Sequence, residues 1–375
     1  SLREELGLSP PERRIGLAAH DFAQALGAKS VVLSRALKVE GVPTVPSRWL
    51  QRLQALAEAA ELTDILAPSQ DWVAWARERD GVEEFEPAIP PRPCPPVSAR
   101  PRSLSVTQVE RWIANPYEIY ARHILDLVPL APLGAEPDIA MRGSVFHAIL
   151  RRFTAAYPDS LPNDIAAVLR EMGDAVFDTL GDNPSLCAFW RPSFHRFAAW
   201  FAASEPARRA NVTASFAEVY GALALPSGFR LTARADRIDT TDSGAVVIYD
   251  YKTGAPPNQG HVAELYRPQL PLEAAIAQGG GFGELGRRDV GGLAYIHILG
   301  RGDGGAEQAA SKVSPSVLAE LALEQLEALI ARYNDAETPY EVKRRANAAF
   351  APAYRFDAYA HLARVAEWLT EGEGI

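Results

Sequence analysis

The pattern of hydrophobic and polar positions changes character twice along the chain. Apolar residues recur at helical spacing over about 141–155 and through 163–209, which predicts amphipathic helices in both segments. Three short segments rich in β-branched and aromatic residues follow, separated by the turn sequences PSG and DSG: SFAEVYGALAL, FRLTARADRID and AVVIYDYK. This pattern predicts a three-stranded antiparallel meander.

Helical and extended patterns alternate again on either side of this region. Before it, Thr107 and Glu110 have the spacing of a capping box, which predicts a helix start. After it, a helix is predicted over about 262–277, GGLAYIHIL is predicted to be a fourth strand, and the last 60 residues have helical periodicity. The predicted fold class is α/β, with a small mixed β-sheet (the antiparallel meander plus a further strand) flanked by helices and with extra helices at both ends.

A proline-rich run separates the N-terminal part of the chain from these elements. Helices are predicted over 12–28 and 69–80, Ser47 is predicted to cap a third helix, and SVVLSRAL, residues 30–37, is predicted to be a buried strand. Residues 86–101 contain seven prolines. Because proline fixes φ and lacks an N–H, we expect an extended connector there. The predicted divisions are 1–85, a linker over 86–102, and a main domain over 103–375.

Composition narrows the class of protein. The 375 residues carry a formal net charge of −9 and two cysteines, Cys94 and Cys187, without metal-ligand spacing. We therefore expect a reducing, cytoplasmic setting and no disulfide scaffold or zinc site. No apolar run is long enough to span a bilayer, so no membrane is expected as a partner. The acidic balance is not typical of nucleic-acid binding. Small basic clusters, usually solvated helix faces, include Arg142, Arg151, Arg152, Arg208, Arg209, Lys343, Arg344 and Arg345.

Charged residues end two neighbouring predicted strands. Asp236 ends one strand, and Asp250 and Lys252 end the next. Side chains alternate between the faces of a strand, so the apolar line of Val246 and Ile248 continues into the charged pair. A strand emerging into solvent with a surface salt bridge would give the same pattern. Asp236 favours a site instead, because a short turn brings it beside Asp250, and adjacent carboxylates repel each other unless a cation lies between them.

This combination of charges suits the hydrolysis of a phosphodiester. Mg²⁺ prefers a few carboxylates and waters as ligands, and a bound cation neutralises phosphate and lowers the pKa of the attacking water. The ammonium group of Lys252 can stabilise the negative charge that develops in the transition state.

Three further residues are candidates, although each also has an ordinary structural interpretation. His147 lies at the edge of the apolar stripe of its helix, one turn after Gly143, and a neutral imidazole can bind metal. Gln269 opens a predicted helix and can reach a phosphate or a metal-bound water, or it is a surface glutamine. Glu218 lies in the first strand of the meander. It adds a carboxylate to the site only if the strand register places it on the face that carries the other candidate acids.

In order along the chain, these motifs resemble a known family. GSVFH, ADRID, YDYKTG and QL resemble the RecB-type branch of the PD-(D/E)XK nuclease superfamily over roughly residues 103–300. The resemblance implies a restriction-endonuclease-like core. The whole chain resembles the C-terminal part of an AddB-type subunit of a bacterial helicase–nuclease, with 1–85 as the remnant of a degenerate helicase-like region.

The resemblance also implies roles for single residues. The implied metal ligands are His147, Asp236, Asp250 and the backbone carbonyl of Tyr251, and the implied catalytic residues are Lys252, Asp250, Asp236 and Gln269. Glu273 stands where the last motif of the family has a tyrosine. Many relatives hold an iron–sulfur cluster, but Asn115 occupies the place of its first cysteine, and asparagine is a poor cluster ligand. The implied ligands lead us to expect Mg²⁺, with Mn²⁺ as a substitute. Because of Asn115 we expect no iron–sulfur cluster. Ordinary packing of the N- and C-terminal helices is expected in place of the cluster.

The resemblance implies a Mg²⁺-dependent deoxyribonuclease, an exonuclease domain of a complex that processes double-strand DNA breaks for recombinational repair. The implied partners are DNA, as a single strand or an unwound duplex end, and an AddA-type helicase–nuclease subunit. One alternative is a catalytically inactive DNA-end-binding or scaffold subunit of the same assembly, although both acids and the lysine are present. Another is a stand-alone nuclease of the CRISPR-adaptation type, which leaves residues 1–60 unexplained.

Overall fold

The structure is a computed structural model that describes residues 11–68, 70–81, 88–130, 139–179, 184–342 and 357–368. The chain divides into two compact units, residues 1–86 and residues 87–375. None of the described helices is long and apolar enough to cross a membrane.

The first unit consists of short elements with little buried surface. They are α2 (Pro11–Ala25), β1 (Lys38–Val39), β2 (Val42–Pro43), α3 (Arg48–Ala59), a 3₁₀ turn (Thr63–Leu66) and α4 (Trp72–Asp80). Ser47 caps α3 as predicted, because its Oγ accepts a hydrogen bond from Leu50 N at 3.2 Å. The predicted buried strand over 30–37 is wrong. Residues 31–36 form no strand and are exposed. In the described part of this unit, Ala57 is the one buried hydrophobic residue, so the unit offers these residues no core.

The second unit contains a mixed sheet and most of the helices. Its helices are α5 (Val106–Ala114), α6 (Pro116–His123), α7 (Ile139–Ala156), α8 (Ile165–Asp178), α9 (Pro184–Arg208), α10 (Gln259–Ala263), α11 (Gln269–Gln278), α12 (Pro315–Asn334) and α14 (Val365–Trp368). Its strands are β3 (Ser103–Ser105), β4 (Val212–Ala224), β5 (Arg230–Thr241), β6 (Val246–Lys252), β7 (Val290–Ile298) and β8 (Gly305–Ala309).

The sheet confirms the predicted fold class. Its strand order is β3-β5-β6-β7-β8, and β4 also pairs with β5. Strands β4, β5 and β6 form the predicted antiparallel meander, and β7 is the predicted further strand, parallel to β6. Strands β3 and β8 were not predicted, because each is short and takes its place only by pairing with a longer neighbour.

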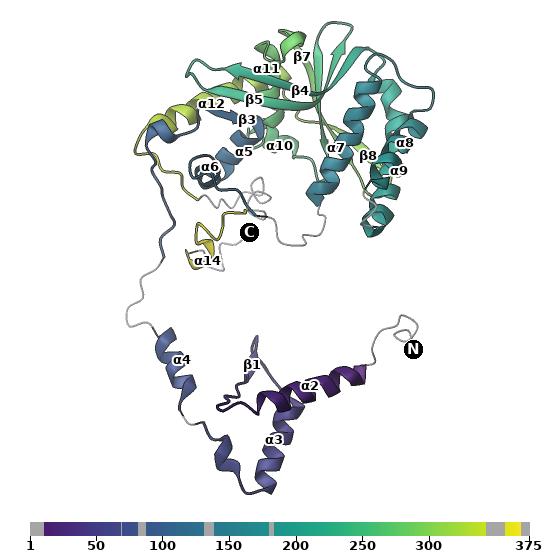
Figure 1. Cartoon of the computed structure of the whole chain (residues 1–375). Coiled ribbons are helices and arrows are strands. Elements are labelled where there is room, and N and C mark those ends of the chain that lie inside the picture. The colour runs from purple at the N-terminus through teal and green to yellow at the C-terminus, as the bar shows by residue number, and fades with distance from the viewer. Residues whose placement is uncertain are drawn as a thin grey trace. The chain divides into compact units, whose positions relative to one another are not determined.

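Helices cover the sheet on two sides (Figure 1). Helices α7, α8 and α9 lie together on one side, and α5, α11 and α12 lie on the other. Val246 and Ile248 of β6 belong to the core with α5, α11 and α12, whereas Tyr249 and Tyr251 belong to the core with α7, α8 and α9. The predicted alternation of β6 is confirmed, and both faces of this central strand are buried.

Strands β5 and β6 separate at Asp236. The first residue of β5 that pairs with β6 is Arg237, which lies opposite Tyr249. The earlier part of β5, Arg230 to Thr232, pairs with β3 instead. Asp236 therefore lies at the point where the two strands diverge, and its side chain is not enclosed by a continuous ladder.

Two predicted helix boundaries are corrected. The capping box of α5 is formed by Ser105 and Gln108, not by Thr107 and Glu110. The predicted helix over 262–277 is two helices, α10 and α11. Pro268 lies at the start of α11 and, because the residue before a proline disfavours helical geometry, the chain breaks there.

The described part of the proline-rich segment, residues 88–101, has no regular structure apart from a 3₁₀ turn at Val97–Ala99, and it packs against later parts of the second unit. Pro93 O accepts a hydrogen bond from Tyr340 N at 2.9 Å. The buried guanidinium of Arg100 donates to the carbonyl oxygens of Tyr333, Asp335 and Ala336 at 2.8, 2.8 and 2.9 Å. These bonds satisfy backbone carbonyl oxygens at and just after the C-terminal end of α12, which have no partner within the helix.

Helix α6 packs against the C-terminal segment by ordinary contacts. Tyr117 and Ala121 form a small core with Tyr359 and Ala363. Asn115, buried before α6, donates from Nδ2 to Asp357 Oδ2 at 3.1 Å. An amide hydrogen bond and apolar packing thus join α6 to the described C-terminal segment.

Candidate active site

The candidate residues come from four elements and meet at the C-terminal end of β6. They are His147 from α7, Asp236 from β5, Asp250 and Lys252 from β6, and Gln269 at the start of α11. Each side chain contacts at least one other member of the group, and Asp236 also contacts the backbone of β6 at Tyr251.

Asp236 connects β6 to α7. Its Oδ2 accepts a hydrogen bond from the backbone N–H of Tyr251 at 2.9 Å, and its Oδ1 lies 3.3 Å from Nδ1 of His147. Burial lowers the pKa of His147, but the hydrogen bond and negative charge of Asp236 outweigh burial, so the His147 pKa is raised above 6.5.

Asp250, Lys252 and Gln269 form a second set of contacts. Lys252 Nζ lies 2.7 Å from Asp250 Oδ2, and Gln269 Nε2 donates to Asp250 Oδ1 at 2.7 Å. Lys252 Nζ also donates to Gln269 Oε1 at 3.3 Å. Burial raises the pKa of the Asp250 carboxyl, against the opposing charge of Lys252. Burial lowers the pKa of Lys252, but the charge of Asp250 outweighs it and raises that pKa overall.

Glu273 is a neighbour of the site whose role the sequence did not reveal. It lies one turn after Gln269 on α11, is 1% exposed, and accepts a hydrogen bond from Gln269 Nε2 at 3.3 Å. Burial, followed by the negative charge of Asp250, raises the Glu273 pKa well above 4.5. Glu273 thus supports the side chain of Gln269 by a hydrogen bond. Its spacing of four residues from Gln269 was the available signal.

Gly143, one turn before His147, allows helix α7 to approach the end of β6 closely. A Cβ added at Gly143 would lie 3.2 Å from Oγ1 of Thr253, the residue after Lys252. Nearby, Arg142 Nη2 donates to Thr253 O at 3.1 Å. Helix α7 is therefore held directly against the end of β6, which brings His147 to Asp236.

Glu218 lies opposite Asp236 but points its carboxylate to two arginines. The β4–β5 pairs Ala217↔Arg237 and Val219↔Ala235 bracket it. Its Oε2 accepts from Arg151 Nη1 at 2.8 Å and from Arg234 Nη2 at 2.5 Å. Glu218 therefore does not join the carboxylates of Asp236 and Asp250.

A buried ion network supports β5 next to Asp236. Arg237 is 0% exposed and its Nη2 lies 2.8 Å from Glu205 Oε1 on α9 and 2.7 Å from Asp239 Oδ2. Arg208 and Arg209 also pair with Glu205, so the interpretation of these two arginines as a solvated helix face is wrong. Residues 343–345, another of the predicted basic clusters, lie outside the described residues.

The donor set fits a hard divalent cation. Among the described residues, no three His, Cys, Asp or Glu side chains converge as a ready-made cage, since the oxygens of Asp250 face Lys252 and Gln269. Carboxylates are nevertheless the ligands that such a cation prefers, and a neutral imidazole can also bind a metal. A cation beside the buried Asp250 would also offset the cost that burial imposes on its charge.

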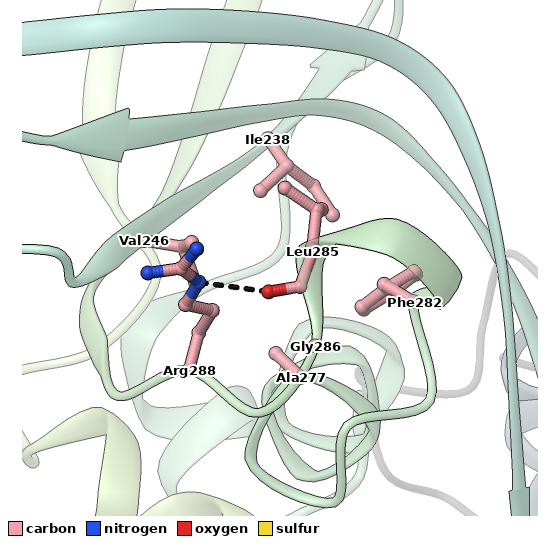
Figure 2. A pocket seen from close by; sticks show the side chains of 7 residues that line it. All are labelled: Ile238, Val246, Ala277, Phe282, Leu285, Gly286 and Arg288. Atoms are coloured by element: carbon pink, nitrogen blue, oxygen red, sulfur yellow. Dashed lines mark hydrogen bonds between the residues drawn. The ribbon is translucent and has the colours of Figure 1, made fainter.

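One hollow in this unit is lined by none of the candidate active-site residues (Figure 2). It is lined by Ile238, Val246, Ala277, Phe282, Leu285, Gly286 and Arg288. The Nε of Arg288 donates to Leu285 O at 2.8 Å, and none of the seven lining residues carries a carboxylate. The hollow is a mainly apolar packing region between β5, β6, the end of α11 and the segment that follows α11.

Comparison with known proteins identifies a family. The family model described as the PD-(D/E)XK nuclease superfamily matches residues 103–349, well over half of the chain. An uncharacterized protein of Rickettsia conorii (strain ATCC VR-613 / Malish 7) is 27% identical over 271 residues, which cover 70% of this chain and 31% of that protein. An uncharacterized protein of Rickettsia typhi (strain ATCC VR-144 / Wilmington) is 29% identical over 212 residues, which cover 53% of this chain and 24% of that protein.

The chain thus spans less than a third of the length of these curated relatives. Among solved structures, SSO0001 is similar at a TM-score of 0.30 and 13% identity, covering 72% of this chain and 88% of that chain.

Proposed function

Because the chain belongs to the PD-(D/E)XK nuclease superfamily, we propose that it is a metal-dependent deoxyribonuclease domain that hydrolyses the phosphodiesters of DNA. The observation that supports this proposal is the meeting of His147, Asp236 and Asp250 with Lys252 and Gln269 at the end of β6. These residues are distant in the sequence, and stability alone does not require buried charges of this kind.

In this proposal His147, Asp236, Asp250 and the backbone carbonyl of Tyr251 hold the cation, Mg²⁺ or in its place Mn²⁺. When bound, the cation neutralises phosphate charge and favours the ionised form of water. Lys252 remains an ammonium group because Asp250 raises its pKa, and it stabilises negative charge on the reacting phosphate. Gln269 orients both residues, since it donates to Asp250 and accepts from Lys252.

The test compares two site variants with matched surface controls. Lys252→Met and Asp250→Asn should each lower the cutting of labelled single-stranded DNA by about 100-fold or more in Mg²⁺ or Mn²⁺, the scale expected for a lost electrostatic group. Lys312→Met and Asp242→Asn change exposed residues of the same types and should cut as the parent does. Circular dichroism verifies that all four variants fold.

Full cutting by either site variant would refute the assigned roles. A parent protein that binds DNA ends but cuts none with any divalent cation would favour the inactive DNA-end-binding or scaffold subunit instead.

We further propose that the chain acts within an AddB-type subunit of a helicase–nuclease that processes double-strand breaks for recombinational repair. Its support is the order of the four motifs, together with relatives that are more than three times as long as the matched region. An equimolar complex with an AddA-type subunit in size-exclusion chromatography with light scattering is the expected result. Separate elution of the two proteins would contradict it.

A further inference from the structure

Beside the candidate active site, an arginine and a tyrosine lie exposed next to each other. Arg234 precedes Asp236 by two residues on β5, so the two side chains emerge on one face of the strand. Tyr220 of β4 is the direct cross-strand partner of Arg234, and directly opposite residues share a face with Cβ atoms about 5 Å apart. Tyr220 is 60% exposed, and the side chain of Arg234 is 63% exposed.

A second arginine reaches the same place from α7. Arg151 lies one turn after His147, so both residues share a helix face. One carboxylate oxygen of Glu218 accepts from Arg151 at 2.8 Å and from Arg234 at 2.5 Å. Two guanidinium groups around one carboxylate leave an excess positive charge. Each guanidinium has five N–H donors, so donors remain for a further anion.

The backbone of Glu218 indicates that this arrangement serves more than stability. Its φ is +49° inside a strand, a left-handed conformation that costs a residue other than glycine about 1–3 kcal/mol. Exposed ion pairs return only about 0–1 kcal/mol each, and the side chains of Arg151 and Arg234 are 46% and 63% exposed. The strained Glu218 therefore holds the guanidinium groups of Arg151 and Arg234 beside the candidate catalytic residues. Its role is to position these two groups.

We propose that Tyr220, Arg234 and Arg151 form a subsite for single-stranded nucleic acid directly next to the catalytic residues. The inference rests on the proposed function and specifies how the substrate strand is held. Arg151 and Arg234 bind backbone phosphates through their free N–H groups, because a guanidinium matches the geometry of a phosphate. Tyr220 stacks on a base, which requires an unpaired strand, and Glu218 keeps the two guanidinium groups in place.

The experiment measures binding and not cutting. Fluorescence anisotropy of a labelled oligothymidylate is followed with the full chain in EDTA at several salt concentrations. Tyr220→Ala should weaken binding about tenfold or more, whereas Tyr220→Phe keeps the ring and should bind as the parent does. Combining Arg151→Ala with Arg234→Ala should lower the slope of log Kd against log salt by about 0.7 for each phosphate that the variant no longer binds.

Arg152→Ala is the matched control, because the next residue along a helix lies about 100° further round and Arg152 is also exposed. Unchanged affinity in Tyr220→Ala, or an unchanged salt slope in the double variant, would overturn the subsite. Equal weakening by Tyr220→Phe and Tyr220→Ala would overturn the stacking role. The proposed function would fail in a different way. The chain would still bind the strand through Tyr220, Arg234 and Arg151 but would not cut DNA in Mg²⁺.

Discussion

Asp236 accepts a hydrogen bond from the backbone N–H of Tyr251 at 2.9 Å, across the point where β5 and β6 separate. The carboxylate thereby accepts the hydrogen bond that a backbone carbonyl of β5 would accept if the two strands were still paired at this point. The same carboxylate contacts His147. One side chain thus both joins two strands and supplies charge to the candidate active site.

These two roles of Asp236 can be separated by Asp236→Asn. The amide oxygen can still accept from Tyr251 N, so we expect the variant to fold. Asp236 raises the pKa of His147 against the opposing effect of burial, so removing its charge should lower that pKa. NMR titration of the imidazole in metal-free buffer measures the change. Asp242→Asn is the control, and an unchanged His147 pKa in Asp236→Asn would contradict the contact.

Glu273 predicts a dependence of stability on pH. Its folded-state pKa is raised well above 4.5 by burial and by the charge of Asp250, so the folded protein holds a proton that the unfolded chain releases. Stability should therefore fall as pH rises above about 4.5 and continue to fall up to the folded pKa, by about 1.4 kcal/mol for each pKa unit between the two states.

Glu273→Gln removes this titration and retains a hydrogen-bonding side chain of the same shape. In EDTA, the variant should have a higher melting temperature than the parent at neutral pH, and the difference should vanish toward pH 4. Thermal unfolding followed by circular dichroism at several pH values makes the comparison. A parent that is the more stable of the two at neutral pH would show that Glu273 is charged in the folded state.

Arg237 predicts a large loss of stability that is independent of catalysis. Arg237→Ala leaves the carboxylates of Glu205 and Asp239 buried without their main partner. We expect a loss of about 3–5 kcal/mol in the free energy of unfolding, measured by urea denaturation. Arg234→Ala, on the same strand but exposed, should cost no more than about 1 kcal/mol. Equal effects of the two variants would contradict the buried network.

Gly143 predicts that helix α7 must approach the end of β6 closely. Gly143→Val would bring branched carbons against Thr253, since even a Cβ lies 3.2 Å from Thr253 Oγ1. We expect Gly143→Val to separate His147 from Asp236 and to lower cutting at least tenfold while the chain stays folded. Gly143→Ala adds only the Cβ and should have a smaller effect. Equal cutting by both variants and the parent, measured with labelled single-stranded DNA, would refute the close approach.

The sequence predicted some elements well and others poorly, for identifiable reasons. The strand β6 was predicted with its two faces, because Val246 and Ile248 alternate with Tyr249 and Tyr251 in a long enough run. The segment over 30–37 has a similar apolar pattern and forms no strand, because residues 31–36 have no neighbouring layer in the described structure on which to be buried. Composition alone does not distinguish these cases.

The sequence by itself determined the meander, the order of the motifs and the identity of the charged residues that end its strands. Only the tertiary structure decided which residues meet: it directs Glu218 to two arginines, joins Glu273 to Gln269, and buries Arg208 and Arg209 against Glu205. The reason is physical. Local spacing fixes the face of an element, whereas the partner of a buried charge depends on elements that pack from distant parts of the chain.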